Sequence, residues 1–211
     1  MSAPRLSFRR TGVAALLLAL MASLAGCLVG PFPTGPFPVP GRIGKIPVQY
    51  NSVMDQPLEK GQSFRIVGKP GQAPDSDLYF GEGVRFVTAA LEARGLHTAP
   101  TANRADIVVE LQFGMLAVRS APGSTGGSTA QQEKHVSLIA RENTATSASD
   151  TPPRTLWSIR LSAIDESDDL RLYLALLVAA SIDQLGVESF GPRTTYIGEN
   201  DRAIEFVRKP L

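Results

Sequence analysis

The residue with the most specific chemical signal is Cys27, the single cysteine of the 211-residue chain. A lone thiol can carry a modification, but it cannot form an intrachain disulfide. The sequence before it is typical of an export signal, because residues 13–24 form a continuous apolar run and the small residues Ala25 and Gly26 separate this run from the cysteine. The basic start of the segment consists of Arg5, Arg9 and Arg10. These features predict that residues 1–26 are a signal peptide, cleaved between Gly26 and Cys27.

The motif Leu24-Ala25-Gly26-Cys27 resembles the lipobox of bacterial lipoproteins. The resemblance implies that the Cys27 thiol receives a diacylglyceryl group and that its new amine is then acylated. Each buried methylene contributes about 0.8 kcal/mol, so several chains form a lasting membrane anchor. Because Leu28 rather than Asp follows the cysteine, the sorting rule of Gram-negative lipoproteins implies the outer membrane, with the body facing the periplasm. In a Gram-positive cell, the outer face of the cytoplasmic membrane is implied instead.

An uncleaved transmembrane anchor is the alternative, since residues 11–34 carry no charged side chain. Prolines at 31 and 33 interrupt that stretch before a comfortable span of about 20 residues. Gly-Pro-Phe-Pro then occurs twice between Gly30 and Pro38, which predicts a polyproline II spacer over 27–43. Phe32 and Phe37 leave a recognition role open for this spacer. The remainder, 44–211, is expected to form one globular domain.

The rest of the sequence offers little for catalysis, metal binding or cofactor binding. His97 and His135 have no second histidine or cysteine at ligand spacing, so we expect no metal, no cofactor and no catalytic residue. Scattered carboxylates such as Glu110 and Asp165 keep one enzyme class open, an envelope hydrolase or carbohydrate-acting enzyme. Such an enzyme needs two carboxylates that face each other across a cleft.

The charge balance indicates an ordinary envelope domain. Loss of the signal peptide removes three arginines and no acid, which leaves 18 basic and 20 acidic residues. No excess of positive charge points to nucleic acid as a partner. About 165 residues are enough to bury a core without disulfides.

The periodicity of the body predicts an α+β fold. Short β-rich runs between turn signals indicate strands at 46–53 and 63–68. Period-2 patterns indicate strands at 106–113, 135–142 and 154–164. Helices are expected at 78–94, from helical spacing, and at 170–185, which begins after an acidic run and ends at Gly186. The last three strands should form an antiparallel meander, because polar connections without helical periodicity join them. We therefore expect an antiparallel sheet, made of this meander and the N-terminal strands, with two helices packed on one face. Residues 194–197 and 203–207 could add an edge strand or a short helix.

The predicted helix at 170–185 has more apolar surface than one sheet face can cover. Leu170, Leu174 and Leu177 belong to one stripe, while Leu172 and Leu176 lie on the opposite side. Either other parts of the chain cover this second side, or Leu172 and Leu176 form a docking surface for an envelope protein.

Three short motifs of the body resemble those of a known family. They are Leu91-Glu92-Ala93-Arg94-Gly95-Leu96, Ala105-Asp106-Ile107-Val108-Val109 and Leu156-Trp157-Ser158-Ile159-Arg160-Leu161. Together they resemble the DUF4136-type bacterial lipoproteins, a domain of unknown function, over residues 46–185. The resemblance implies an α+β fold in the cell envelope and no particular activity. We expect a non-catalytic binding or assembly component of the envelope.

Overall fold

The computed structural model describes residues 44–69, 78–118, 131–144 and 153–209. Cys27, the predicted signal peptide and the predicted spacer lie outside the described residues. All described helices and strands fall within 44–211, the predicted domain.

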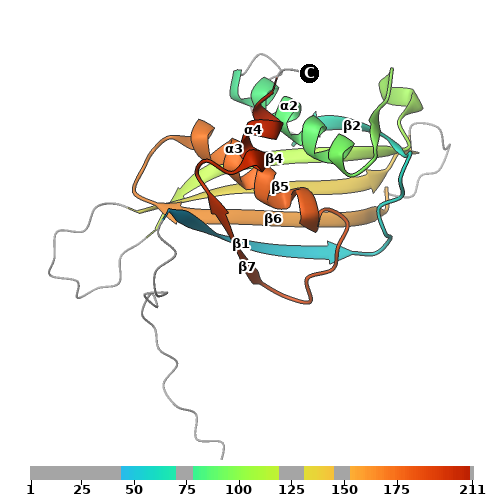
Figure 1. Cartoon of the computed structure of the whole chain (residues 1–211). Helices are drawn as coiled ribbons and strands as arrows, with labels where there is room; N and C mark the ends of the chain where they lie inside the picture. Colours follow the sequence, from blue (N-terminus) through green and yellow to red (C-terminus); the bar gives the residue numbers. More distant parts are fainter. Residues whose placement is uncertain (1–43, 70–77, 119–130, 145–152, 210–211) are drawn as a thin grey trace, which may run out of the picture. The chain divides into compact units, whose positions relative to one another are not determined.

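One sheet of seven strands forms the framework of the described chain (Figure 1). Its strands are, in chain order, β1 Lys45–Met54, β2 Ser63–Gly68, β3 His97–Thr98, β4 Ile107–Ala117, β5 Gln132–Glu142, β6 Thr155–Asp165 and β7 Arg193–Gly198. Across the sheet they lie in the order β3-β2-β4-β5-β6-β1-β7. The N-terminal strand β1 therefore lies between β6 and the C-terminal strand β7.

The centre of the sheet is the predicted antiparallel meander of β4, β5 and β6. Leu111 pairs with Leu138, and Leu138 pairs with Ile159. All three side chains are buried. An apolar row thus crosses three strands on one face, as the period-2 patterns predict.

The prediction of an antiparallel sheet is wrong at one edge, where β2 runs parallel to β3 and β4. The helix α2, Leu78–Ala93, connects β2 to this part of the sheet. A chain that crosses one face of a sheet through a helix re-enters the sheet in the same direction. The sheet is therefore mixed, and the predicted helix at 78–94 is the physical cause.

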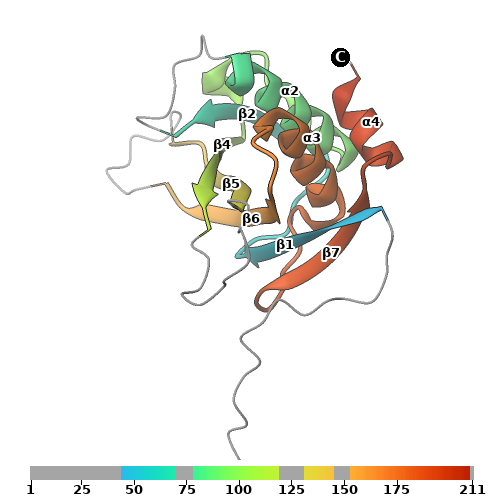
Figure 2. The ribbon, with the colours of Figure 1, turned by 90° about the vertical axis from the view of Figure 1, so that its left-hand side faces the viewer.

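Three α-helices of the described chain, not two, cover one face of the sheet (Figures 1 and 2). They are α2, α3 Leu170–Ser181 and α4 Arg202–Arg208. The C-terminal tail supplies both elements that its sequence left open, since β7 pairs with β1 and α4 packs against α2 and α3. The two-helix prediction is wrong because α4 has only seven residues, too few for helical periodicity to separate it from a strand.

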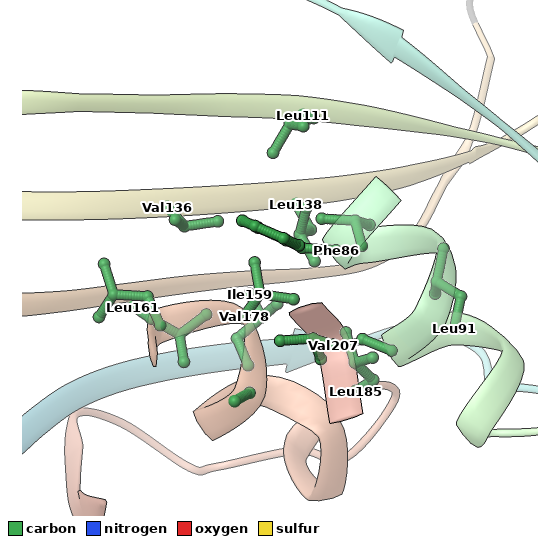
Figure 3. Close-up of a cluster of buried hydrophobic side chains, with 14 of the residues drawn as sticks. Phe86, Leu91, Leu111, Val136, Leu138, Ile159, Leu161, Val178, Leu185 and Val207 are labelled. Atoms are coloured by element: carbon green, nitrogen blue, oxygen red, sulfur yellow. The ribbon is translucent and has the colours of Figure 1, made fainter. Parts of the chain in front are cut away.

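The core lies between the helical layer and the sheet (Figure 3). Figure 3 shows Phe86 of α2 near Leu138 of β5, and Val178 of α3 near Ile159 of β6. Every residue of α3 from 173 to 179 is buried, because the sheet lies on one side of this helix and α2 and α4 pack against others. A helix that is apolar all round requires such an environment.

No described helix covers the other face of the sheet (Figure 2). Polar side chains alternate with the buried ones there, and Ser137, Arg160 and Asn51 form one row in register. This distribution is typical of an antiparallel sheet with one face toward water.

Candidate functional site

The two carboxylates considered for an enzyme, Glu110 and Asp165, lie on opposite faces of the sheet. Glu110 alternates with the buried Val109 and Leu111 and belongs to the face without helices. Asp165 follows the buried Ala163 on the helix-covered face. Register also connects Asp165 through Gln132 to Ala117, about 23 Å along β4 from Glu110 at roughly 3.3 Å per residue. The pair does not converge on one cleft.

Glu110 has a structural environment of its own. Arg141 donates to Glu110 Oε2 at 2.6 Å, and Gln112 Nε2 donates to Glu110 Oε1 at 2.6 Å. Burial alone would raise the pKa of Glu110, but these two hydrogen bonds outweigh it and hold the pKa below its ordinary value. Glu110 is therefore an ionised partner of Arg141. This environment does not favour the protonated form that a general acid needs.

Asp165 belongs to a cluster with Lys134 and Tyr173 at the end of β6. Lys134 is completely buried, and its Nζ lies 3.1 Å from the Asp165 carbonyl oxygen and 3.8 Å from Asp165 Oδ1. The same ammonium lies 4.5 Å from the centroid of the Tyr173 ring. Burial, together with its hydrogen bond to Asp165, raises the pKa of Tyr173. The cluster places a carboxylate beside the buried Lys134 and keeps the Tyr173 hydroxyl protonated. Such pairing of buried polar groups indicates a role in the fold.

Of the two leucines considered for docking, only Leu172 lies at the surface. Leu176 is 1% exposed and belongs to the core, whereas Leu172 is 36% exposed. Packing of α2 and α4 against α3 covers the second side of the helix, which is the first of the two alternatives for this surplus apolar surface. Leu172 therefore stays available as an exposed apolar side chain in the first turn of α3.

Leu172 lines a cleft of about 350 Å³ formed by all three helices, which we call the arginine cleft. Its lining residues are Glu82, Arg85, Phe86, Asp169, Arg171, Leu172 and Arg208. The first three come from α2, the next three from the start of α3, and Arg208 from the end of α4. Three guanidinium groups and two carboxylates give the lining a formal charge of +1.

Both acidic residues of the arginine cleft are already engaged. Arg171 holds Glu82 with two hydrogen bonds, from Nε to Oε2 at 2.6 Å and from a terminal nitrogen to Oε1. Asp169 Oδ1 accepts from the backbone N–H of Leu172 at 3.0 Å and caps α3, as acidic residues at a helix start do. Arg171 is thus paired with Glu82, and Asp169 is bonded to the backbone at the start of α3.

Arg85 and Arg208 are different, because neither forms an ion pair with any described residue. Arg85 Nε is buried without a hydrogen-bond partner in the described chain, and its guanidinium carbon lies 5.4 Å from the centroid of the Phe86 ring. A buried donor without an acceptor is costly, and nothing in the described chain offsets this cost at Arg85 Nε. The arginine cleft thus combines two guanidinium groups that have no ion-pair partner in the described chain with two apolar side chains, Phe86 and Leu172.

Sequence reasoning identified Leu172 but missed Arg85, Arg171 and Arg208. These arginines come from three helices, and their convergence depends on the packing of α4. A partial signal exists in the sequence, since Arg85 and Arg171 each lie beside an apolar residue that packs inward or lines the cleft.

Other site classes find no support within the ranges that the structure describes. No group of three His, Cys, Asp or Glu side chains there could hold a metal ion. His97 lies in the edge strand β3, while His135 lies over Gly114 on the helix-free face, where burial lowers its pKa. Among the described helices, none is both long and apolar enough to cross a membrane.

No protein-family model and no curated protein matches the chain. Among solved structures, a PelC dodecamer from Paraburkholderia phytofirmans is similar at 14% identity over 66% of this chain and 98% of that chain, with a TM-score of 0.41. A DUF4136 family protein from Bacteroides thetaiotaomicron is similar at 12% identity over 64% and 94%, with a TM-score of 0.44. A PDZ domain protein from Parabacteroides distasonis shares 9% identity over 74% and 40%, with a TM-score of 0.47. A DUF4136 family protein is therefore among the structural neighbours of this chain.

Proposed function

We propose that this chain is a lipid-anchored, non-catalytic binding component of the bacterial cell envelope, and that it engages an envelope protein through the arginine cleft. One observation carries the proposal. Arg85 and Arg208, which have no ion-pair partner in the described chain, line the same cleft as the exposed Leu172. Arginine is enriched in protein interfaces relative to the rest of the surface, and an exposed apolar side chain beside it gains from burial against a partner.

The proposed location depends on the sequence. The lipobox-like motif ending at Cys27, followed by Leu28, supports lipidation and the outer membrane, with the body facing the periplasm. The outer face of the cytoplasmic membrane replaces this location in a Gram-positive cell. The resemblance of three body motifs to DUF4136-type lipoproteins supports the same compartment. An envelope hydrolase is not proposed, because Glu110 and Asp165 point to opposite faces of the sheet.

Labelled palmitate tests the anchor. The full-length chain, expressed in a bacterial host, is expected to incorporate label and to lose the mass of residues 1–26. The Cys27→Ala variant should incorporate none and keep the mass of the precursor. A variant that is still labelled, or that is processed to the mature mass, contradicts lipidation at Cys27.

A photo-crosslinking amino acid tests the binding surface in intact cells. At position 172 it should give one discrete protein adduct, which the Arg208→Gln variant weakens. The matched control is position 116, because Leu116 is also exposed but lies in β4 on the helix-free face. Equal adducts at both positions, or an adduct at 172 that is indifferent to Arg208, would contradict binding through the arginine cleft.

A further inference from the structure

The charge of the arginine cleft limits the kind of anion that it can hold. Glu82 uses the guanidinium of Arg171, so Arg85 and Arg208 are left to face a ligand. The carboxylate of Asp169 lies in the same lining. With a formal charge of +1, a monoanion neutralises the cleft, whereas a phosphate dianion reverses its charge. Repulsion from Asp169 adds to this preference.

The apolar part of the lining limits the ligand further. Phe86 is buried and Leu172 is partly exposed, and both contact the cleft. A small inorganic anion leaves these walls hydrated. A carboxylate attached to an apolar group covers them while it meets the guanidinium groups, and burial of apolar area then contributes about 25 cal/mol per Å².

We infer that the arginine cleft binds a single carboxylate carried on an apolar segment of a polypeptide, with Arg85 and Arg208 as its donors. The inference rests on the proposed function, since it names the chemistry that the partner presents. Arg85 is half-buried, lines the cleft and forms no ion pair in the described chain, so its guanidinium group can pair with this carboxylate. Planar guanidinium groups match carboxylate geometry better than an ammonium does.

The test uses the mature lipoprotein purified in detergent and three small probes: N-acetyl-leucine, N-acetyl-leucinamide and inorganic phosphate. Saturation-transfer NMR is expected to show binding of N-acetyl-leucine and none of its amide, which lacks the charge. Phosphate at equal concentration should not displace it. Arg85→Gln and Arg208→Gln should each weaken N-acetyl-leucine about tenfold, the value expected for one charge-assisted hydrogen bond.

Arg202→Gln is the matched control, because it removes the same charge from the exposed start of α4 and Arg202 does not line the cleft. It should bind N-acetyl-leucine as the wild type does. Arg208 lies at the exposed end of α4, so its variant stays informative even where Arg85→Gln fails to fold. Equal binding of the amide, displacement by phosphate, absence of binding, or equal weakening by Arg202→Gln each overturns the inference. If the crosslink at position 172 persists in any of these cases, the proposed function stands and only the inference of a carboxylate ligand is rejected.

Discussion

Ser52 and Ser189 form three hydrogen bonds although 137 residues separate them. Ser52 N–H donates to Ser189 Oγ at 3.0 Å, and both the N–H and the hydroxyl of Ser189 donate to Ser52 O at 3.1 Å. The ladder between β1 and β7 ends at the pair Tyr50 and Arg193. Beyond that pair, Ser189 forms hydrogen bonds with the backbone of β1 that a strand residue would otherwise form. A side-chain oxygen therefore accepts from the buried backbone N–H of Ser52, which lies beyond the end of the β1–β7 ladder and would otherwise have no partner.

Replacement of Ser189 by alanine should destabilise the fold by about 1–3 kcal/mol, because it leaves the buried Ser52 N–H without its acceptor. The free energy of unfolding, measured by urea denaturation, checks this value. Ser162→Ala is the control, since Ser162 is half-buried in β6 and its hydroxyl takes part in no hydrogen bond within the described chain. Equal losses for the two variants would show that Ser189 Oγ does not support the edge of β1.

The centre of the fold could be predicted from sequence because each of its strands has its own period-2 signal. β4, β5 and β6 are eleven residues long each, and Ile107, Val136 and Trp157 all face the core. Strand direction at the edge could not be predicted in this way, since the pattern of β2 is the same in either direction. Parallel pairing of β2 results from the crossover through α2.

The candidate site could be predicted only in part, for a similar reason. The surplus apolar surface of α3 can be recognised in the sequence, but which part of it stays exposed depends on where α4 packs. In the packed structure Leu176 is buried and Leu172 stays exposed. Arg85 and Arg208 lie 123 residues apart in the chain, and no local pattern connects them.

Glutamine at positions 172 and 176 separates the exposed leucine from the buried one. Leu176→Gln should lower the free energy of unfolding by about 2–5 kcal/mol, because a buried apolar side chain is lost and an amide is placed in the core. Leu172→Gln should lower it by less than about 1 kcal/mol, since this side chain already meets solvent. Thermal or urea denaturation of the two single variants measures both losses. Similar losses for both would contradict the different burial of the two positions.

Asp165 should make stability depend on acid pH. Burial would raise its pKa, but hydrogen bonds from Tyr173 and the Ser167 backbone, together with the nearby Lys134 ammonium, hold the pKa below its ordinary value. A carboxylate with a lowered pKa in the folded state stabilises the protein above the unfolded-state pKa of about 4, and this contribution is lost as the pH falls through the folded-state pKa. The wild type should therefore lose stability below about pH 4 more steeply than Asp165→Asn, which cannot ionise.

At neutral pH, Asp165→Asn should be less stable than the wild type by on the order of 1–2 kcal/mol. The fully buried Lys134 would lose its neighbouring carboxylate, while the 40% exposure of the Asp165 side chain limits the loss through solvent screening. The double variant Lys134→Met, Asp165→Asn removes the buried charge as well, and a methionine of similar length can fill the space. It should recover most of the stability that Asp165→Asn loses, and its unfolding free energy should lack the steep decline below about pH 4. Urea denaturation of the three proteins between pH 7 and pH 3 measures both effects. A double variant that is less stable than Asp165→Asn would mean that Lys134 stabilises the fold by contacts other than its charge pairing with Asp165.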